Sequence, residues 1–208
     1  RSANAKWLTE IAHKNPIWIH TKDAARLGVD NGDLLKITTP IGWFVDKVWV
    51  TEAIKPGVVA CSHHIGRWRR QQDAGNRLMT NTVDIQNLGD GQWKMKTVKG
   101  VEPWKSKDPD TNRVWWRDGG VHQNITHAAN PDPISGAHCW LQKVSISVPE
   151  RGEKYGDVYV DTNKSFEHFK KWNAWAIDRE THPNGLRRPL WMARPLTPQK
   201  NQFYLKKK

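Results

Sequence analysis

Strand and helix signals alternate in the stretch that decides the fold, NPIWIHTKDAARLGVDNGDLLKITTPIG, residues 15–42. The apolar run at residues 17–20 follows a proline and predicts a short strand. Thr21 is expected to be the N-cap of a two-turn helix, and Gly28 stands at the C′ position where a left-handed residue ends a helix. The segment DNGD then predicts a turn, and LLKITT predicts a second strand. Residues 15–42 therefore predict a compact strand–helix–strand unit.

Further strands are expected on both sides of the middle of the chain. WFVDKVWVT at residues 43–51 alternates apolar and polar residues, and VVACS at residues 58–62 follows a Pro-Gly turn. WLQKVSISV at residues 140–148 has the same alternation. The sequence therefore predicts a mainly β fold with short helices, in the α+β class.

Two regions lack this regular strand pattern. Residues 66–120 are rich in Gly, Asn, Asp and Lys, which predicts one long irregular loop excursion of the kind that is usually functional or ordered by a partner. Helical spacing is present at residues 6–15 and again at residues 165–177, where Ser165 is the expected N-cap. Four prolines after residue 180 make the final part an extended arm.

The composition indicates an anionic partner. The 208 residues carry a formal charge of +12, which favours nucleic acid, an acidic subunit, a membrane surface or a phosphorylated cofactor. Thirteen tryptophans imply an aromatic surface that faces a partner. Cys61 and Cys139 are the only cysteines, too few for an iron–sulfur cluster or a Cys-rich zinc site. We expect two free, buried thiols rather than a disulfide.

The stretch CSHHIGRWRRQ, residues 61–71, concentrates the candidate chemistry. His63 and His64 are adjacent, so on a strand they point to opposite faces and do not share one zinc ion. No second pair of ligands stands at finger-like spacing. Cys61 lies in an apolar run without a nucleophile elbow, which favours a structural thiol over a catalytic one.

Two classes of anionic ligand remain for this stretch. Residues 67–70, with residues 115–117, interleave Arg and Trp as single-strand nucleic-acid binders do, although the basic residues are spread over the whole chain. A phosphorylated cofactor is the other class. Backbone N–H groups at Ser62 and Gly66 would bind a pyrophosphate, Arg67 would add a bidentate clamp, and the histidines would donate hydrogen bonds.

Four segments in order carry a family resemblance. RSANAKWLTEI (1–11) precedes the stretch at 15–42, and KVWVTEAIKPGVVACSHHIGRW (47–68) and GVHQNITHAANPDPISGAHCWLQKVSISV (120–148) follow it. Their sequences closely resemble those of the C-terminal cofactor-binding domain of the molybdopterin oxidoreductases, the dimethyl sulfoxide reductase superfamily. One such motif is weakly specific, whereas the series covering residues 1–150 is specific.

The resemblance implies a six-stranded double-psi β-barrel over residues 1–150, with the excursion inside it. Residues 151–208 would form an aromatic, Pro-rich extension that packs on other domains or subunits. The implied cofactor is bis(molybdopterin guanine dinucleotide) carrying molybdenum or tungsten, whose pterin and guanine edges suit Asn and Gln side chains. Carried over position by position, the expected cofactor-binding residues are Arg1, Ser2, Asn4, His20, Thr21, His63, His64, Arg67, His122, Gln123 and Asn124.

The chain also departs from the family. Family catalytic subunits are several times longer, and their metal ligand and any iron–sulfur cluster lie in earlier domains. We therefore expect the C-terminal portion of a catalytic subunit, or a separately encoded piece completed by a companion chain. It would have no catalytic or metal-ligating residue of its own and would be inactive alone.

The resemblance also suggests partners and a substrate class. The expected partners are the rest of the catalytic subunit and an iron–sulfur electron-transfer subunit, with membrane contact only through partners and no nucleic acid. The motifs WIHTKDAARLGV and SHHIGRW favour the branch of the family that acts on polysulfide, thiosulfate and sulfite. The alternative is a basic, Trp- and Arg-rich subunit that binds single-stranded nucleic acid or serves assembly. The sequence leaves the compartment open between the extracytoplasmic side and the cytoplasm.

Overall fold

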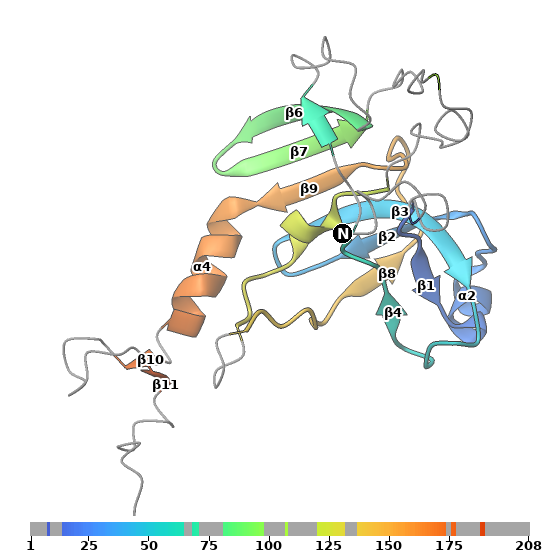
Figure 1. The fold of residues 1–208 in the computed structure, drawn as a ribbon, viewed down its shortest axis with the longest axis horizontal. Helices are drawn as coiled ribbons and strands as arrows, with labels where there is room; N and C mark the ends of the chain where they lie inside the picture. Colours follow the sequence, from blue (N-terminus) through green and yellow to red (C-terminus); the bar gives the residue numbers. More distant parts are fainter. Residues whose placement is uncertain are drawn as a thin grey trace, which may run out of the picture. The chain divides into compact units, whose positions relative to one another are not determined.

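The computed structural model is dominated by a mixed β-sheet and contains short helices (Figure 1). The residues that it describes are 8, 14–64, 68–70, 81–97, 107, 120–131, 137–173, 176–177 and 188–189. Their elements, in chain order, are β1 (Ile17–Ile19), α2 (Thr21–Leu27), β2 (Leu34–Thr38), β3 (Gly42–Val50), β4 (Val59–Ala60), β5 (Trp68–Arg70), β6 (Asn81–Gly89), β7 (Gln92–Thr97), the 3-10 helix η3 (Gln123–Thr126), β8 (Ser145–Ser147), β9 (Val158–Asp161), α4 (Thr162–Asn173), β10 (Ala176–Ile177) and β11 (Arg188–Pro189).

The chain divides into two compact units. The first unit holds residues 1–128 and 140–166, and the second holds residues 129–139 and 167–208. The mainly β class with short helices is confirmed by the strands of the first unit. None of the helices that the structure describes is long and apolar enough to cross a membrane.

The sheet of the first unit runs in the order β4-β1-β3-β9-β7-β6-β5, and β2 pairs with both β3 and β8. β1 is parallel to β3, with Ile17 opposite Val48, and antiparallel to β4, with Trp18 opposite Ala60. Among the described strands the sheet does not close on itself, so the expected double-psi barrel is not seen here. The strands expected at residues 58–62 and 140–148 are present but shorter, as β4 and β8.

Helix α2 is capped one residue earlier than the sequence predicts. His20, not Thr21, is the N-cap, because its Nδ1 accepts a hydrogen bond from the Lys22 backbone N–H at 3.0 Å. An unprotonated imidazole nitrogen replaces the usual hydroxyl or carboxylate of a cap. Gly28 ends the helix with φ 67°, and its N–H binds the carbonyls of Ala24 and Ala25, so the predicted left-handed C-terminus is confirmed.

Residues 66–120 contain a regular hairpin, which corrects the expectation of a long loop excursion with little regular structure. β6 and β7 form an antiparallel hairpin in which Val83 is opposite Thr97 and Ile85 is opposite Met95. The chain reverses at Asp90, which has a positive φ of 46°. The Asp-Gly pair at this turn is a recognised hairpin signal between alternating strands.

A strand in the C-terminal region completes the sheet. β9 pairs with β3 on one side and with β7 on the other (Figure 1). Residues 158–161 therefore lie inside the sheet of the first unit, although the sequence assigned them to the extension. The approach to β3 is close, because a Cβ at Gly42 would lie 2.1 Å from the Tyr159 carbonyl oxygen.

Of the two helices predicted at residues 6–15 and 165–177, the structure describes the second almost completely and the first only in part. Helix α4 begins at Thr162 and ends at Asn173, so Ser165 is not its N-cap and residues 176–177 belong to β10. Asp161 stands before the helix, and its Oδ1 accepts from the Lys164 N–H at 3.1 Å. The helix predicted at residues 6–15 lies outside the described residues except Leu8, which is helical, and Lys14 and Asn15, which are not.

The described residues of the second unit include an isolated bridge and the β10–β11 pair. Pro131 and His138 form an isolated antiparallel bridge, and the Cys139 N–H donates to the Asn130 carbonyl at 3.0 Å. The Asn130 Oδ1 lies 2.5 Å from Nε2 of His168 on α4. Cys139 is free, as Cys61 is in the first unit, so the prediction of two unpaired thiols is confirmed; both are half-buried.

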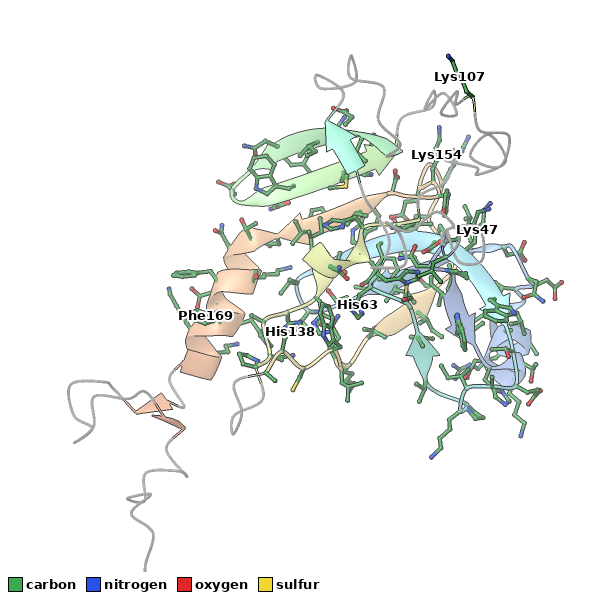
Figure 2. The ribbon with its side chains drawn as sticks, in the orientation of Figure 1. Lys47, His63, Lys107, His138, Lys154 and Phe169 are labelled. Atoms are coloured by element: carbon green, nitrogen blue, oxygen red, sulfur yellow. The ribbon has the colours of Figure 1, made fainter. Side chains whose placement is uncertain are left out.

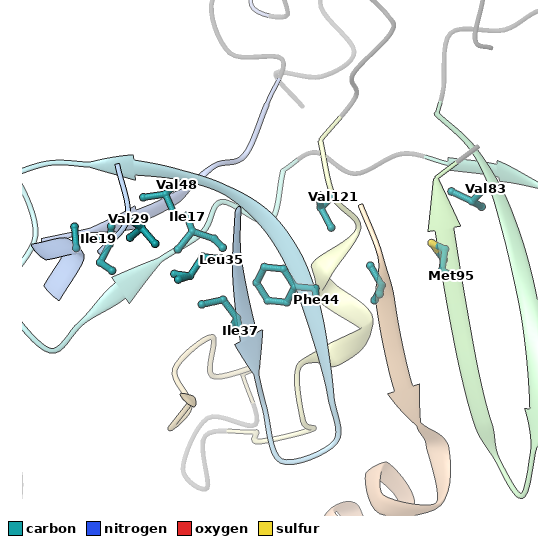
Figure 3. Packing of buried hydrophobic residues seen from close by; sticks show 12 residues of the cluster. Ile17, Ile19, Val29, Leu35, Ile37, Phe44, Val48, Val83, Met95 and Val121 are labelled. Carbon is teal, nitrogen blue, oxygen red and sulfur yellow. The ribbon is translucent and has the colours of Figure 1, made fainter. Parts of the chain in front are cut away.

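The core of the first unit forms where alternate residues of the strands turn inward (Figure 3). Ile17 and Ile19 are fully buried, while Trp18 between them is half-buried, as the two-residue period of a strand requires. Each fully buried aliphatic side chain contributes about 1.5–3 kcal/mol. The buried members of the cluster are Ile17, Ile19, Ala24, Val29, Leu35, Ile37, Phe44, Val48, Val83, Met95, Val121 and Val158. Val121 places the segment before η3 against the sheet, which positions the candidate site.

Candidate functional site

Asn15 joins three segments that are distant in sequence. Its side-chain Nδ2 donates to the Ser62 carbonyl at 3.0 Å and to the Val121 carbonyl at 2.9 Å. Its Oδ1 accepts from the Val121 N–H at 2.8 Å. The residue is only 1% exposed, so these bonds are made away from water, where an unmade bond is costly. The amide thereby holds the segment before β1, the loop after β4 and the segment before η3 together.

Cys61 is part of the same junction. Its Sγ donates to the Asn15 carbonyl at 3.0 Å. Burial raises the pKa of the Cys61 thiol, and the nearby Asp46 carboxylate raises it further. The thiol is therefore neutral at physiological pH and makes a poor nucleophile. This agrees with the prediction of a structural rather than a catalytic cysteine.

The loop of residues 61–64 meets the η3 segment directly. The Asn124 Nδ2 donates to the His63 carbonyl at 3.2 Å. Within the loop, the Ser62 hydroxyl lies in very close contact with Nδ1 of His64. The side chain of His63 is exposed and lies beside the segment that contains η3 (Figure 2). These expected site residues are therefore neighbours in space.

The 3-10 helix η3 fixes Gln123 and Asn124. The Gln123 Nε2 donates to the Asn124 Oδ1 at 3.0 Å, and the Thr126 hydroxyl donates to the Gln123 carbonyl at 2.7 Å. The Thr39 hydroxyl donates to the Thr126 carbonyl at 2.6 Å, which ties the helix to the turn before β3. His122 stands at the N-cap position of η3. The amide of Asn124 is half-buried and that of Gln123 is 8% exposed, so Asn124 is the more accessible of the two.

His20 and Thr21 lie at the other end of β1. The strand runs from the Asn15 end to His20, and at about 3.3 Å per residue the two ends are about 17 Å apart. The His20 Nε2 lies 3.1 Å from Glu52 Oε2, and the Thr21 hydroxyl donates to Glu52 Oε1 at 2.5 Å. The Thr21 hydroxyl, and then His20, hold the pKa of Glu52 below its usual value. The structure gives both residues partners at the start of α2 and does not bring them to the 61–64 loop.

Four of the expected site residues lie outside the described part of the chain. They are Arg1, Ser2, Asn4 and Arg67. The structure thus brings together His63, His64, His122, Gln123 and Asn124, on two adjoining segments. In the described ranges no three His, Cys, Asp or Glu side chains are grouped as a metal site would require.

Residues 1–89 match the family described as the molydopterin dinucleotide binding domain. Over these residues the chain resembles a molydopterin dinucleotide binding domain. The match confirms the family resemblance carried by the motifs and supports a molybdopterin cofactor. The matched residues include Asn15 and the loop of residues 61–64. The η3 segment of the site lies outside the matched residues.

Relatives of this domain are subunits of reductases. A tetrathionate reductase subunit of Archaeoglobus fulgidus is 34% identical over 199 residues, which cover 83% of this chain and 17% of the relative. The arsenate respiratory reductase molybdopterin-containing subunit of Shewanella sp. strain ANA-3 is 30% identical over 76 residues, 33% of this chain and 9% of the relative. The corresponding protein of Chrysiogenes arsenatis is 32% identical over 68 residues, 29% and 8% respectively. The chain therefore spans about a sixth of the length of the tetrathionate reductase relative.

The side chains at the junction of the dinucleotide binding domain suit a pterin nucleotide. His63 presents an exposed imidazole, and Asn124 presents a half-buried amide next to it. Imidazole and amide groups supply both donors and acceptors, which the edges of pterin and guanine require. The hydrogen-bonding groups therefore fit the cofactor, while the Arg clamp expected at residue 67 lies outside the described residues.

Sequence reasoning missed two residues that organise this site. Asn15 was seen only as the start of a motif, although a polar residue directly before a buried strand is a signal for a backbone-binding amide. Trp140 was placed in a strand, but it is 48% exposed and stacks on His63 with ring centroids 4.4 Å apart. No local pattern in the sequence predicts this contact, because it joins two distant loops.

Proposed function

We propose that this chain is the cofactor-binding portion of a molybdenum or tungsten oxidoreductase catalytic subunit that uses bis(molybdopterin guanine dinucleotide). The Asn15 junction carries this proposal, because one buried amide assembles the three motif segments that the family resemblance assigns to the cofactor. The family match over residues 1–89 and the reductase relatives support it.

The residues of the chain would hold and orient the dinucleotide. His63, His64 and Asn124 would form hydrogen bonds with polar edges of the cofactor, since their side chains gather at the junction. Asn15 and Thr39 would act through the backbone, by holding the two loops that carry these groups. When bound, the cofactor supplies the redox chemistry. Neither a metal ligand nor an iron–sulfur cluster is assigned to this chain; both would belong to the remainder of the enzyme.

The proposal includes the barrel and the extension. We propose that residues 1–150 form the six-stranded double-psi barrel of the family in the complete subunit. The support is the mixed pairing of this region, in which β1 is parallel to β3 and antiparallel to β4, and β2 pairs with β3 and β8. Residues beyond β9 would pack on the preceding domains or on an iron–sulfur partner subunit. A closed barrel in an experimental structure of the complete subunit would support this part, and a sheet with open edges there would refute it.

A sulfur compound is the substrate class that we propose. The motifs of residues 18–29 and 62–68 favoured the polysulfide, thiosulfate and sulfite branch. A tetrathionate reductase subunit matches over 83% of this chain, whereas the two arsenate reductase relatives match over about a third of it. The complete enzyme should therefore reduce tetrathionate, polysulfide or thiosulfate in preference to arsenate. Turnover of arsenate alone would refute this assignment.

The cofactor assignment is tested by analysing the natively purified complex that contains this chain. Mass spectrometry would measure molybdenum, tungsten and released guanosine monophosphate per chain. Metal and guanine nucleotide in fixed proportion to the chain would support the proposal. Their absence, together with binding to single-stranded oligonucleotides that weakens steeply with salt, would favour the nucleic-acid alternative instead.

A matched pair of variants connects that analysis to the junction. Asn15→Ala removes the buried amide, and Asn31→Ala removes an exposed amide that accepts from the Val50 N–H at 2.7 Å. We expect Asn15→Ala to lower the guanine nucleotide content of the complex and Asn31→Ala to leave it unchanged. Equal retention in the two variants would contradict the assigned role of the junction.

A further inference from the structure

Trp140 connects the two loops of the site by its ring. The indole stacks on the His63 imidazole with centroids 4.4 Å apart and an interplanar angle of 13°. The edge contact with the His127 ring has a centroid distance of 5.5 Å and an angle of 65°. His63 belongs to the loop after β4, and His127 follows η3. The indole therefore contacts one imidazole from each loop.

The segment that carries Trp140 is itself held in place. The Gln142 Oε1 accepts from the Ala128 N–H at 3.3 Å, which ties the chain after Trp140 to the end of the η3 segment. Ala128 is fully buried, so this hydrogen bond attaches the chain after Trp140 to the core. Trp140 thus presents its ring two residues before a point of attachment.

Within the described residues, the contacts of His63 involve its backbone carbonyl and its ring face. Its backbone carbonyl accepts from Asn124, and its ring is stacked on Trp140. Among the residues that the structure describes, none makes a hydrogen bond to either ring nitrogen of His63. An exposed imidazole has several rotamers, and stacking on a neighbouring ring favours the rotamer that makes the stack. The site therefore holds a preoriented donor and acceptor pair with no protein partner within the described chain.

We propose that Trp140 is a positioning residue that fixes the His63 imidazole in the orientation in which it binds the pterin dinucleotide. This inference rests on the proposed cofactor-binding function. A tryptophan that served only core packing would be buried, whereas Trp140 is 48% exposed and its ring contacts include the stack on His63, a residue of the site. Preorganisation of this kind lowers the entropy cost of binding, so its loss appears as faster release of the ligand.

The test measures cofactor release from the complete complex with Trp140→Leu. Guanosine monophosphate and metal per chain are followed during timed dialysis. We expect release about 3- to 10-fold faster than from the wild type, the range set by the loss of one aromatic pair. Trp140→Phe keeps a ring for stacking and should restore slow release. Trp140→Met keeps apolar bulk without a ring and supplies the same comparison if the leucine variant does not assemble.

Trp49 provides a matched control. It is 45% exposed and contacts Trp18 with ring centroids 4.5 Å apart, so Trp49→Leu removes a similar aromatic pair from β3. We expect this variant to release the cofactor at the wild-type rate. Equal acceleration by Trp49→Leu and Trp140→Leu would overturn the inference, because a general loss of packing would then explain both.

A double variant separates positioning from a structural role. If Trp140 acts through His63, the pair His63→Ala with Trp140→Leu releases the cofactor no faster than His63→Ala alone. Additive acceleration would overturn the inference. A wild-type complex that contains neither metal nor guanine nucleotide would instead refute the proposed function. Normal loading of the wild type with unchanged release from Trp140→Leu would refute the Trp140 assignment alone.

Discussion

Replacing Asn15 by alanine should destabilise the domain more than any other single amide substitution in the described residues. The change removes two hydrogen bonds donated to the Ser62 and Val121 carbonyls and one accepted from the Val121 N–H. Each buried hydrogen bond contributes about 1 kcal/mol net, and a buried N–H left unpaired costs about 1–3 kcal/mol. We therefore expect a loss of about 3–5 kcal/mol, a large part of the about 5–15 kcal/mol that stabilises a typical domain.

The assay is chemical denaturation of the complete catalytic subunit, combined with hydrogen exchange at residues 61–64 and 120–126. Exchange at both segments should rise together in Asn15→Ala, because one side chain holds them. Asn31→Ala is the control, since its amide is exposed and makes one described hydrogen bond, so its loss should stay below about 1 kcal/mol. A destabilisation no larger than that of Asn31→Ala, or exchange that rises at one segment only, would refute the reasoning.

Three further changes test other parts of the structure. Cys61 should react with iodoacetamide at least about tenfold more slowly in the folded protein than in urea, because burial raises the pKa of its thiol; equal rates would contradict this. Glu52→Gln should flatten the acid side of the stability curve. The Thr21 hydrogen bond lowers the folded-state pKa of Glu52, so its stabilisation is present above the unfolded pKa near 4.5 and is lost as pH falls through the folded value. Identical acid unfolding midpoints for variant and wild type would refute this contribution. Gly42→Ala should cost about 3 kcal/mol by thermal unfolding, because the added Cβ would lie 2.1 Å from the Tyr159 carbonyl; a stable variant would show that β3 and β9 can separate at this point.

Local signals in the sequence predicted the parts of the fold that local physics decides. Gly28 ends α2 because only a residue tolerant of positive φ fits there, and the alternation around Ile17 gives β1 its buried face. His20 displaced Thr21 as the cap because an imidazole nitrogen also accepts a backbone hydrogen bond, which cap preferences underweight. The turn at Asp90 carried a hairpin signal that the polar composition of its surroundings hid.

The parts that were missed depend on partners far along the chain. β9 has four residues, too few to stand out by pattern, and it is a strand because β3 and β7 lie on either side of it. The residues of the candidate site also divide into those that local motifs predicted and those that depend on distant contacts. The family motifs predicted His63 and Asn124 as cofactor-binding residues, but the hydrogen bonds of Asn15 and the stacking of Trp140 follow only from the folded geometry.

The central place of β9 sets the order in which the sheet is completed during synthesis. β3 and β7 are synthesised before residues 158–161. The edge of each strand that pairs with β9 therefore stays unpaired until β9 has been synthesised. Unpaired strand edges recruit other chains, and pairings of large sequence separation form late. Between the synthesis of β7 and that of β9, a nascent chain of this protein therefore has two strand edges that can pair with other chains.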